Sequence, residues 1–295
     1  MKDRFVRFDW AIKRLLRQKA NFGVLEGFLT VFLGEKVTIV DILESESNQQ
    51  DEFDKFNRVD IKARNSKGEI IIVEVQNTSE VFYLERILYG VAKAITEHIS
   101  LGDDYGEVKK VYSISVLYFD LGEGDDYLYK GQTSFFGIHT NDELKITTRQ
   151  RDAIVRKAPE EIFPTYYLIR VNNFDRVAVS PMEEWMRYLK KGEISADAKA
   201  PGLQEAREKL LYYQMDPAER HAYDEHLNAV MIQNDVLGNA RAEGLAEGRA
   251  EGLAEGKTSQ QMLTARTMLS DGMSIDLVAK YTGLTKSQIE AFAAE

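Results

Sequence analysis

The sequence predicts an α/β domain that is followed by an α-helical region. Residues 59–75 have the pattern of a β-hairpin between helical segments, whereas from about residue 181 onward the spacing of apolar residues is helical. The chain has 295 residues, 44% of them hydrophobic. This is enough for one sizeable buried core with further segments attached to it.

Two helices are expected before the hairpin. Residues 9–17 and residues 22–33 place apolar side chains at helical spacing. Asn21 directly precedes the second segment, and asparagine is a common N-cap because its side chain accepts a hydrogen bond from a free backbone N–H. We therefore expect Asn21 to cap the second helix.

The hairpin is the most informative part of the chain. Its two halves, residues 59–63 and 70–75, are rich in β-branched residues, and between them the chain reads Asn-Ser-Lys-Gly. In a three-residue loop Gly68 would take the left-handed position, which fixes the pairing of the two strands. This register places Asp60 directly opposite Glu74.

Three polar side chains would then share one face of the hairpin. Directly opposed residues have Cβ atoms about 5 Å apart, and Gln76 points to the same side as Glu74 because it lies two residues further along the strand. Two close carboxylates repel unless a positive charge lies between them, and Mg²⁺ binds one or two carboxylates together with waters and phosphate oxygens. The pattern suits a magnesium site, and equally an exposed strand face that carries solvated acidic residues.

A longer helix and further strands are expected after the hairpin. Residues 79–100 have helical spacing, with Ser79 as the expected cap and Gly102 as the expected end. Residues 111–121 form a strongly β-prone run that predicts the next strand. Two shorter segments are expected to extend the sheet or its flanks: residues 144–146 and 165–171.

Short motifs follow one another in a recognisable order over most of residues 5–175. The hairpin contributes Asp60 and then Glu74-Val75-Gln76. The supporting motifs are Phe8-Asp9-Trp10-Ala11-Ile12-Lys13, Phe28-Leu29, Leu33-Gly34, Arg86-Ile87-Leu88-Tyr89, Gly102, Tyr105 and Val111-Tyr112-Ser113-Ile114. This order resembles the Rpn family of recombination-promoting nucleases and transposases, a branch of the PD-(D/E)XK nuclease superfamily. The resemblance implies a restriction-endonuclease-like core, in which helices flank a central mixed sheet.

The resemblance also implies a site that hydrolyses phosphodiester bonds with Mg²⁺, or with Mn²⁺ as a substitute. Asp60, Glu74 and the main-chain carbonyl of Val75 would bind the ion, and Gln76 would position the attacking water. The common signature has a lysine in place of Gln76. An uncharged amide orients water by hydrogen bonding but adds no positive charge. Slower chemistry is one expected consequence, and a site kept only for its fold is the alternative.

Four further residues are candidates for supporting roles. Asp9 in the first predicted helix and Glu26 in the second can approach the site, and Lys13 can contact a DNA phosphate. Because Asp9 and Lys13 are four residues apart, an ordinary ion pair on the helix surface is the plainer interpretation of Lys13. Arg86 fits either a phosphate contact or structural packing against the site.

The overall charge does not suit a protein that coats nucleic acid. The formal net charge is −10, whereas non-specific DNA binding depends on neutralisation of phosphates by lysine and arginine. The first twenty residues carry an excess of basic side chains, and residues 41–60 carry an excess of acidic ones. This distribution is compatible with metal-dependent work on DNA, although a charged segment is more often a solvated face.

The remaining composition indicates a cytoplasmic protein without membrane association. The sequence has no cysteine and no apolar run of membrane-spanning length. Its first residues, Met-Lys-Asp-Arg, lack the apolar stretch of a signal peptide. The four histidines do not have metal-ligand spacing: His98, His139, His221 and His226.

Three segments are expected after a nuclease-like domain at residues 1–180. Residues 181–240 predict a helical subdomain, in which Trp185 and Tyr188 pack onto the core. Residues 241–257 repeat Ala-Glu-Gly-Leu with variation, and a glycine at every fourth position weakens a helix, so this segment is a helix or a linker. The aligned glycines suit a homo-oligomer formed through the C-terminal helical region, and a plain linker is the equal alternative.

Residues 258–295 predict a small helix-turn-helix-like module. One helix is expected at residues 275–281 and a second after the turn, with Thr285 as its N-cap. Residues 287–291 of the second helix offer one acidic and no basic side chain, whereas a recognition helix presents polar and basic groups to the bases. Packing or partner binding is therefore favoured over sequence-specific DNA binding.

Residues and resemblance together predict a metal-dependent DNA endonuclease with links to DNA recombination or mobile elements. Its expected partner is DNA. The alternative is a catalytically weak or inactive oligomeric scaffold or regulator that uses the helical tail to bind partners. Asp60 and Glu74 favour the enzyme, whereas the acidic net charge and Gln76 favour the alternative.

Overall fold

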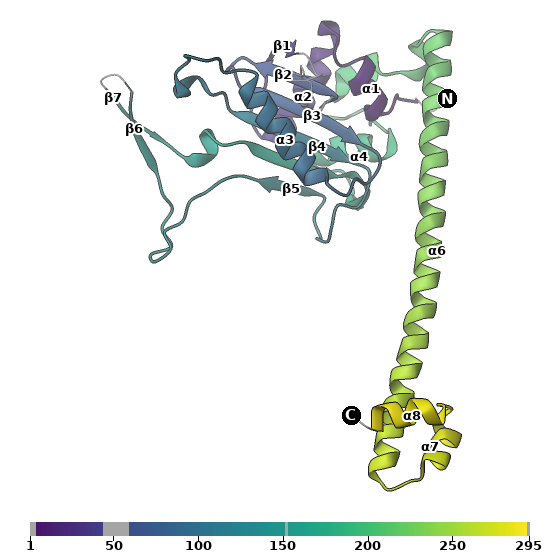
Figure 1. Cartoon of the computed structure of the whole chain (residues 1–295). Coiled ribbons are helices and arrows are strands. Elements are labelled where there is room, and N and C mark those ends of the chain that lie inside the picture. Colours follow the sequence, from purple (N-terminus) through teal and green to yellow (C-terminus); the bar gives the residue numbers. More distant parts are fainter. Residues whose placement is uncertain (1–3, 44–58, 151–152, 294–295) are drawn as a thin grey trace. The chain divides into compact units, whose positions relative to one another are not determined.

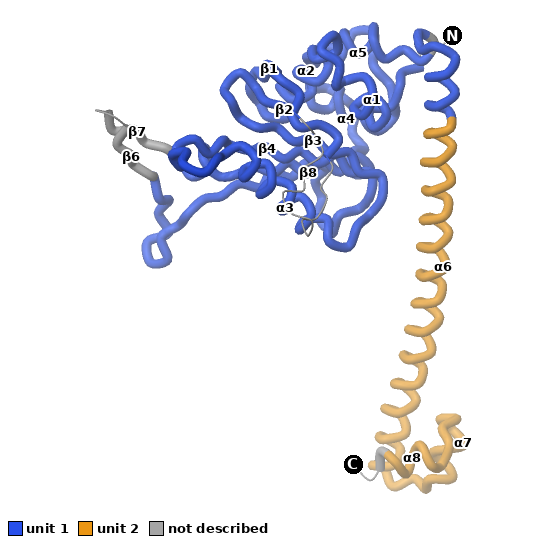
Figure 2. The backbone as a smooth tube through the Cα atoms, turned by 45° about the horizontal axis from the view of Figure 1, so that its top comes forward, with its two compact units in different colours: residues 1–224 blue, residues 225–295 orange. Residues whose placement is uncertain are grey.

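The computed structural model describes residues 4–43, 59–150 and 153–293 (Figure 1). The chain divides into two compact units, Met1–Asp224 and Glu225–Glu295 (Figure 2). Most of the acidic stretch expected at residues 41–60 lies outside the described residues. Among the described helices, none combines the length and the apolar character that crossing a lipid bilayer requires.

A six-stranded mixed sheet forms the centre of the first unit, with the strand order β1-β2-β3-β4-β8-β5. Strands β3, β4 and β8 run parallel to one another, and the other pairings are antiparallel. The strands are β1 (Ile39–Leu43), β2 (Ile61–Asn65), β3 (Ile70–Gln76), β4 (Val111–Leu117), β5 (Leu128–Gly131) and β8 (Thr165–Arg170). The α/β fold with a central mixed sheet is thereby confirmed.

Two parts of the sheet differ from the sequence-based expectation. Strands β1 and β5, at the two edges of the sheet, were not predicted. Of the segment expected at residues 144–146, only Ile146 lies in a strand: it begins β6 (Ile146–Gln150), which pairs with β7 (Ala153–Lys157) in a separate two-stranded sheet. Short edge strands bury less apolar surface than central ones, so their hydrophobic pattern is weaker.

Helix α3 (Tyr83–Thr96) covers one face of the sheet (Figure 1). Its buried residues Val91 and Ala94 pack against Ile72 of β3 and Val111 of β4. Residues of β3 are buried on both faces, as is usual for a strand in the parallel part of a sheet. Glu74, which lies on this strand, is therefore largely shielded from solvent.

Helix α3 begins later and ends earlier than the sequence suggested. The expected helix at residues 79–100 starts at Tyr83, and its N-cap residue is Phe82 rather than Ser79. The residues before it are turned toward the end of β3, where Glu80 hydrogen-bonds to Gln76. The start of the helix is thus set by a contact with β3.

The other face of the sheet is covered by α1 (Phe8–Arg14), α2 (Phe22–Leu33) and α4 (Pro181–Lys191), with α5 (Leu203–Lys209) next to them (Figures 1 and 2). Asn21 occupies the N-cap position of α2 as expected. Its side chain, however, does not cap the helix but donates a hydrogen bond to the carbonyl of Leu15, at 2.8 Å.

An aromatic cluster joins α4 to α1 and α2. Trp185 is fully buried, and its ring centroid lies 5.4 Å from that of Phe28 and 6.1 Å from that of Phe8. Helix α2 also lies very close to the start of α5. A Cβ atom on Gly27 would lie 2.4 Å from the backbone of Gly202, the N-cap residue of α5. Only glycine permits that distance at position 27.

The second unit holds most of helix α6 (Pro217–Ser270) and the two helices that follow it. Helix α6 includes the Ala-Glu-Gly repeat, so residues 241–257 are helical. Helices α7 (Ile275–Thr282) and α8 (Lys286–Ala293) follow, and they form a small apolar cluster with the end of α6: Ala265, Val278, Leu284 and Ile289. Thr285 caps α8 as expected, since its hydroxyl accepts a hydrogen bond from the backbone N–H of Gln288.

Candidate functional site

The hairpin of β2 and β3 has the predicted register. Ile61 pairs with Val73 and Ala63 with Ile71, and Gly68 has a φ of 79°, as the three-residue loop requires. Asp60 directly precedes β2 and lies one position beyond the last pair, which puts it opposite Glu74. The two carboxylates are therefore brought to one end of the hairpin.

Asp60 is held by the main chain of β3. Its Oδ2 accepts a hydrogen bond of 2.7 Å from the backbone N–H of Val75, and its side chain is 18% exposed. In a strand the N–H and C=O of one residue point toward the same neighbour, so the carbonyl of Val75 also faces the side of Asp60. A carboxylate and a main-chain oxygen are thus presented together.

Glu74 is buried in the parallel part of the sheet. Burial raises its pKa from 4.5 to about 7, the positive charge of Arg86 opposes this rise, and the nearby charge of Asp60 adds to it. The Nη2 atom of Arg86 lies 3.2 Å from Oε2 of Glu74. The structure thus pairs a buried carboxylate with a cation, and a second carboxylate is close enough to repel it.

Gln76 belongs to a network that includes a residue not singled out from the sequence, Glu80. The Gln76 amide nitrogen donates to Oε1 of Glu80 at 2.7 Å, and its carbonyl oxygen accepts from Arg86 at 3.5 Å. Arg86 Nε in turn lies 3.1 Å from Oε2 of Glu80. The amide of Gln76 is therefore fixed in one orientation, and both edges of the Arg86 guanidinium face carboxylates.

Two buried hydroxyl groups lie beside Glu74: Tyr83 Oη and Ser115 Oγ. Ser115 on β4 is the register partner of Glu74. The pKa of Tyr83 is raised, mainly by burial and in addition by the negative charge of Glu74. The surroundings of Glu74 are therefore polar although they are buried.

The donor set fits a hard divalent cation with several water ligands. Asp60, Glu74 and the carbonyl of Val75 all offer oxygen, which is the ligand type that Mg²⁺ prefers. Within the described ranges, no group of three or more acidic or histidine side chains could hold a metal ion by itself. The protein would thus supply two carboxylates, and the main chain, water and substrate would supply the other ligands.

Asp9 contacts the residue that follows Gln76 in the chain. It is fully buried, its carboxylate is bound by Arg7 at 3.1 Å, and its Oδ2 accepts a hydrogen bond of 3.3 Å from the side chain of Asn77. Asn77 directly follows Gln76 and β3. Asp9 therefore ties α1 to the end of β3.

Glu26 is not brought to the two carboxylates. Its Oε1 accepts a hydrogen bond of 2.7 Å from the backbone N–H of Ile39. Ile39 pairs with Asn65, at the opposite end of β2 from Asp60. This places Glu26 about 16 Å along the strand from the site.

Lys13 comes close to Asp60, which its spacing from Asp9 did not suggest. Its Nζ lies 3.6 Å from Oδ1 of Asp60, and its side chain is 47% exposed. Lys13 and Arg17, together with Val59 and Asp60, line a cavity of about 380 Å³. Two basic side chains, Lys13 and Arg17, thus line the same cavity as the carboxylate of Asp60.

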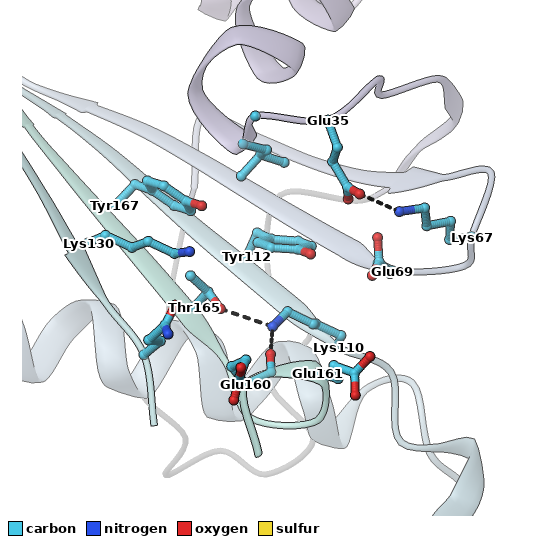
Figure 3. Close-up of a pocket in the computed structure, with 13 residues that line it drawn as sticks. Glu35, Lys67, Glu69, Lys110, Tyr112, Lys130, Glu160, Glu161, Thr165 and Tyr167 are labelled. Carbon is cyan, nitrogen blue, oxygen red and sulfur yellow. Dashed lines mark hydrogen bonds and ion pairs between the residues drawn. The ribbon is translucent and has the colours of Figure 1, made fainter. Parts of the chain in front are cut away.

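A larger cavity, of about 600 Å³, lies elsewhere, where β3, β4 and β8 begin (Figure 3). Two of its lysines have partners in its wall: Lys67 binds Glu35 at 2.6 Å, and Lys110 donates a hydrogen bond of 2.9 Å to the hydroxyl of Thr165. Glu69 lines this cavity and directly precedes β3. Because side chains alternate between the two faces along a strand and Glu69 is five residues before Glu74, the two point to opposite faces of the sheet. This cavity is separate from the Asp60 and Glu74 site.

The raised pKa of Glu74 predicts a pH-dependent stability. Between pH 4.5 and about 7 the folded protein holds a proton that the unfolded chain releases, so the free energy of unfolding falls as the pH rises through this window. Glu74→Gln removes the titration. Between pH 5 and pH 8, we therefore expect the free energy of unfolding of this variant to rise relative to that of the wild type by up to about 3 kcal/mol. Urea unfolding at both pH values measures this difference. A difference that does not change with pH would contradict the raised pKa.

Two family models match the chain. One, described as a PD-(D/E)XK nuclease family transposase, matches residues 6–147. The other, described as the C-terminal HTH domain of the Rpn/YhgA-like nuclease family, matches residues 261–293. The first match includes the whole hairpin, and the second includes α7 and α8. No curated protein and no solved structure gives a significant match.

Proposed function

Because this chain belongs to the Rpn/YhgA-like branch of the PD-(D/E)XK nuclease family of transposases, we propose that it is a metal-dependent DNA endonuclease. It cleaves DNA by hydrolysis, with Mg²⁺ as the resident ion and Mn²⁺ as a substitute, and acts in the cytoplasm. The observation that carries this proposal is the placement of Asp60 opposite the buried Glu74, beside the main chain of Val75. Its link is to DNA recombination or mobile elements, in keeping with the family description.

Each site residue has a role in this proposal. Asp60, Glu74 and the Val75 carbonyl hold the ion, which when bound polarises the phosphate and lowers the pKa of a water molecule. Gln76 orients that water through its amide, which Glu80 and Arg86 fix in place. The water oxygen attacks phosphorus as the bond to the leaving oxygen breaks. No covalent bond to the protein is formed.

Charged side chains around the site position these groups. Arg86 balances the charge of Glu74 and is engaged with Glu80, so in this proposal it orders the site and does not serve as a free phosphate contact. Lys13, whose ammonium group lies 3.6 Å from Asp60, contacts DNA phosphate in this proposal. Asp9 sets the position of α1 through Asn77.

A second candidate function is that of an oligomeric scaffold or regulator that acts through the C-terminal helices. Helix α6 carries glycine at positions 244, 248, 252 and 256, and Leu245 and Leu253 are 75% and 77% exposed. Small residues at this spacing let a second helix approach closely, and exposed leucines on it gain from burial. A homo-oligomer through α6 is compatible with nuclease activity, so the two functions are tested separately.

Supercoiled plasmid provides the test of the nuclease. The purified protein is expected to convert it to nicked or linear forms in Mg²⁺ or Mn²⁺, and EDTA should stop the reaction. Absence of cleavage with both ions would overturn the proposal and leave the scaffold. Light scattering on a size-exclusion column, with the full chain, would then decide whether the protein is a homo-oligomer.

A further inference from the structure

The site lacks an uncompensated positive charge at the end of β3. Gln76 is neutral, and its amide is taken up by Glu80 and Arg86. The charge of Arg86 faces two carboxylates, Glu74 and Glu80. Phosphodiester hydrolysis increases the negative charge at the phosphate, and a positive group placed there in advance accelerates it. A positive side chain would therefore add to the effect of the metal ion.

Helix α1 delivers such a side chain. Asp9 is buried and bonded to Asn77 at the end of β3, which fixes the helix. Lys13 follows four residues later and so lies on the same side of the helix. Its ammonium group reaches Asp60, with 3.6 Å between Nζ and Oδ1. The contact between Asn77 and Asp9 thus fixes helix α1, and the helix places the ammonium group of Lys13 beside Asp60.

The cavity beside Asp60 has the composition of a phosphate subsite. Its volume is about 380 Å³, and two basic side chains, Lys13 and Arg17, line it together with the carboxylate of Asp60. The Lys13 side chain is 47% exposed, so its ammonium group can leave Asp60 for a phosphate oxygen without an opening of the core. With 3.6 Å between the charged atoms and the ammonium group half in water, this ion pair is weaker than a fully buried one, which favours the exchange.

We propose that this cavity receives the scissile phosphate and that Lys13 is a catalytic residue, which supplies from α1 the positive charge that Gln76 lacks. The inference rests on the proposed nuclease function. In the free protein Lys13 neutralises Asp60, and it therefore competes with a cation for the same carboxylate. Lys13 thus has two effects of opposite sign: it weakens cation binding to the free protein, and it speeds cleavage.

These two effects are measured on three variants. In Lys13→Met the charge is lost, in Lys13→Arg it is kept, and Lys19→Met removes a charge from an exposed position on the same basic segment as the matched control. Single-turnover cleavage of plasmid at saturating protein should fall about 100-fold in Lys13→Met. Lys13→Arg should recover a large part of this loss, and Lys19→Met should cleave like the wild type.

Titration of Mn²⁺ into the protein without DNA gives the second readout. Lys13→Met should bind the ion about threefold more tightly than the wild type, because a competing surface charge has been removed. Equal or weaker ion binding, or unchanged cleavage by Lys13→Met, would overturn the assignment while leaving a nuclease that cleaves. A wild type inactive in Mg²⁺ and Mn²⁺ would overturn the nuclease function and this inference with it. Circular dichroism confirms that each variant is folded.

Discussion

Replacing Asp60 with asparagine is expected to reduce metal-dependent DNA cleavage about a thousandfold. A bound divalent cation stabilises the charge of the transition state by several kcal/mol, and each 1.36 kcal/mol changes the rate about tenfold. Asparagine keeps an oxygen that can accept the hydrogen bond of the Val75 N–H, but it loses the charge that attracts the ion. The measurement is the initial rate of plasmid nicking in Mg²⁺.

Asp41→Asn is the matched control for this variant. Asp41 lies on β1, where its half-exposed carboxylate pairs with Arg64, and exposed pairs of this kind contribute little to stability. We expect its nicking rate to equal that of the wild type. Nicking by Asp60→Asn at the wild-type rate would mean that Asp60 is not in the active site, or that the activity comes from a contaminant.

Replacing Trp185 with alanine is expected to lower the free energy of unfolding by about 3 to 5 kcal/mol, the range for buried aromatic residues. The Trp185 side chain is fully buried, it contacts the rings of Phe8 and Phe28, and its Nε1 donates a hydrogen bond of 3.0 Å to the carbonyl of Pro201. Removal leaves a cavity between α4 and two helices, α2 and the helix α1 that carries Asp9 and Lys13. Urea unfolding followed by circular dichroism measures the loss.

Two other substitutions separate the causes of this effect. Trp185→Phe keeps part of the aromatic volume but loses the hydrogen bond to Pro201. It should lower the free energy of unfolding by less than Trp185→Ala does. Leu88→Ala changes a residue of α3 that is 60% exposed, and we expect it to stay within about 0.5 kcal/mol of the wild type. A loss below about 1 kcal/mol in Trp185→Ala would show that α4 is not an integral part of the core.

The Trp185 prediction bears on how much of the chain the nuclease core needs. The nuclease family model ends at residue 147, whereas α4 starts at Pro181 and packs on α1 and α2. Both regions lie in the unit Met1–Asp224. The position of Lys13 on α1 thus depends on helices that come much later in the sequence.

The sequence alone was sufficient to predict the hairpin, its register and the position of Asp60 opposite Glu74. The turn residues of the loop, with Gly68 in the left-handed position, set the register, and the alternation of side chains along a strand then placed Asp60 opposite Glu74. The same local patterns predicted the central strands and the C-terminal helices. Such patterns are reliable because they depend on residues that are neighbours along the chain.

The tertiary structure alone decided how the site is completed. Lys13 pairs with Asp60, Asp9 with Asn77, and Glu80 with Gln76, although the helical spacing of Asp9 and Lys13 suggested a pair within α1. These partners meet because α1 packs across the end of β3 and because the chain before α3 turns back on that strand. The periodicity of a segment determines which side chains share a face. Which other segment that face meets depends on packing between distant parts of the chain.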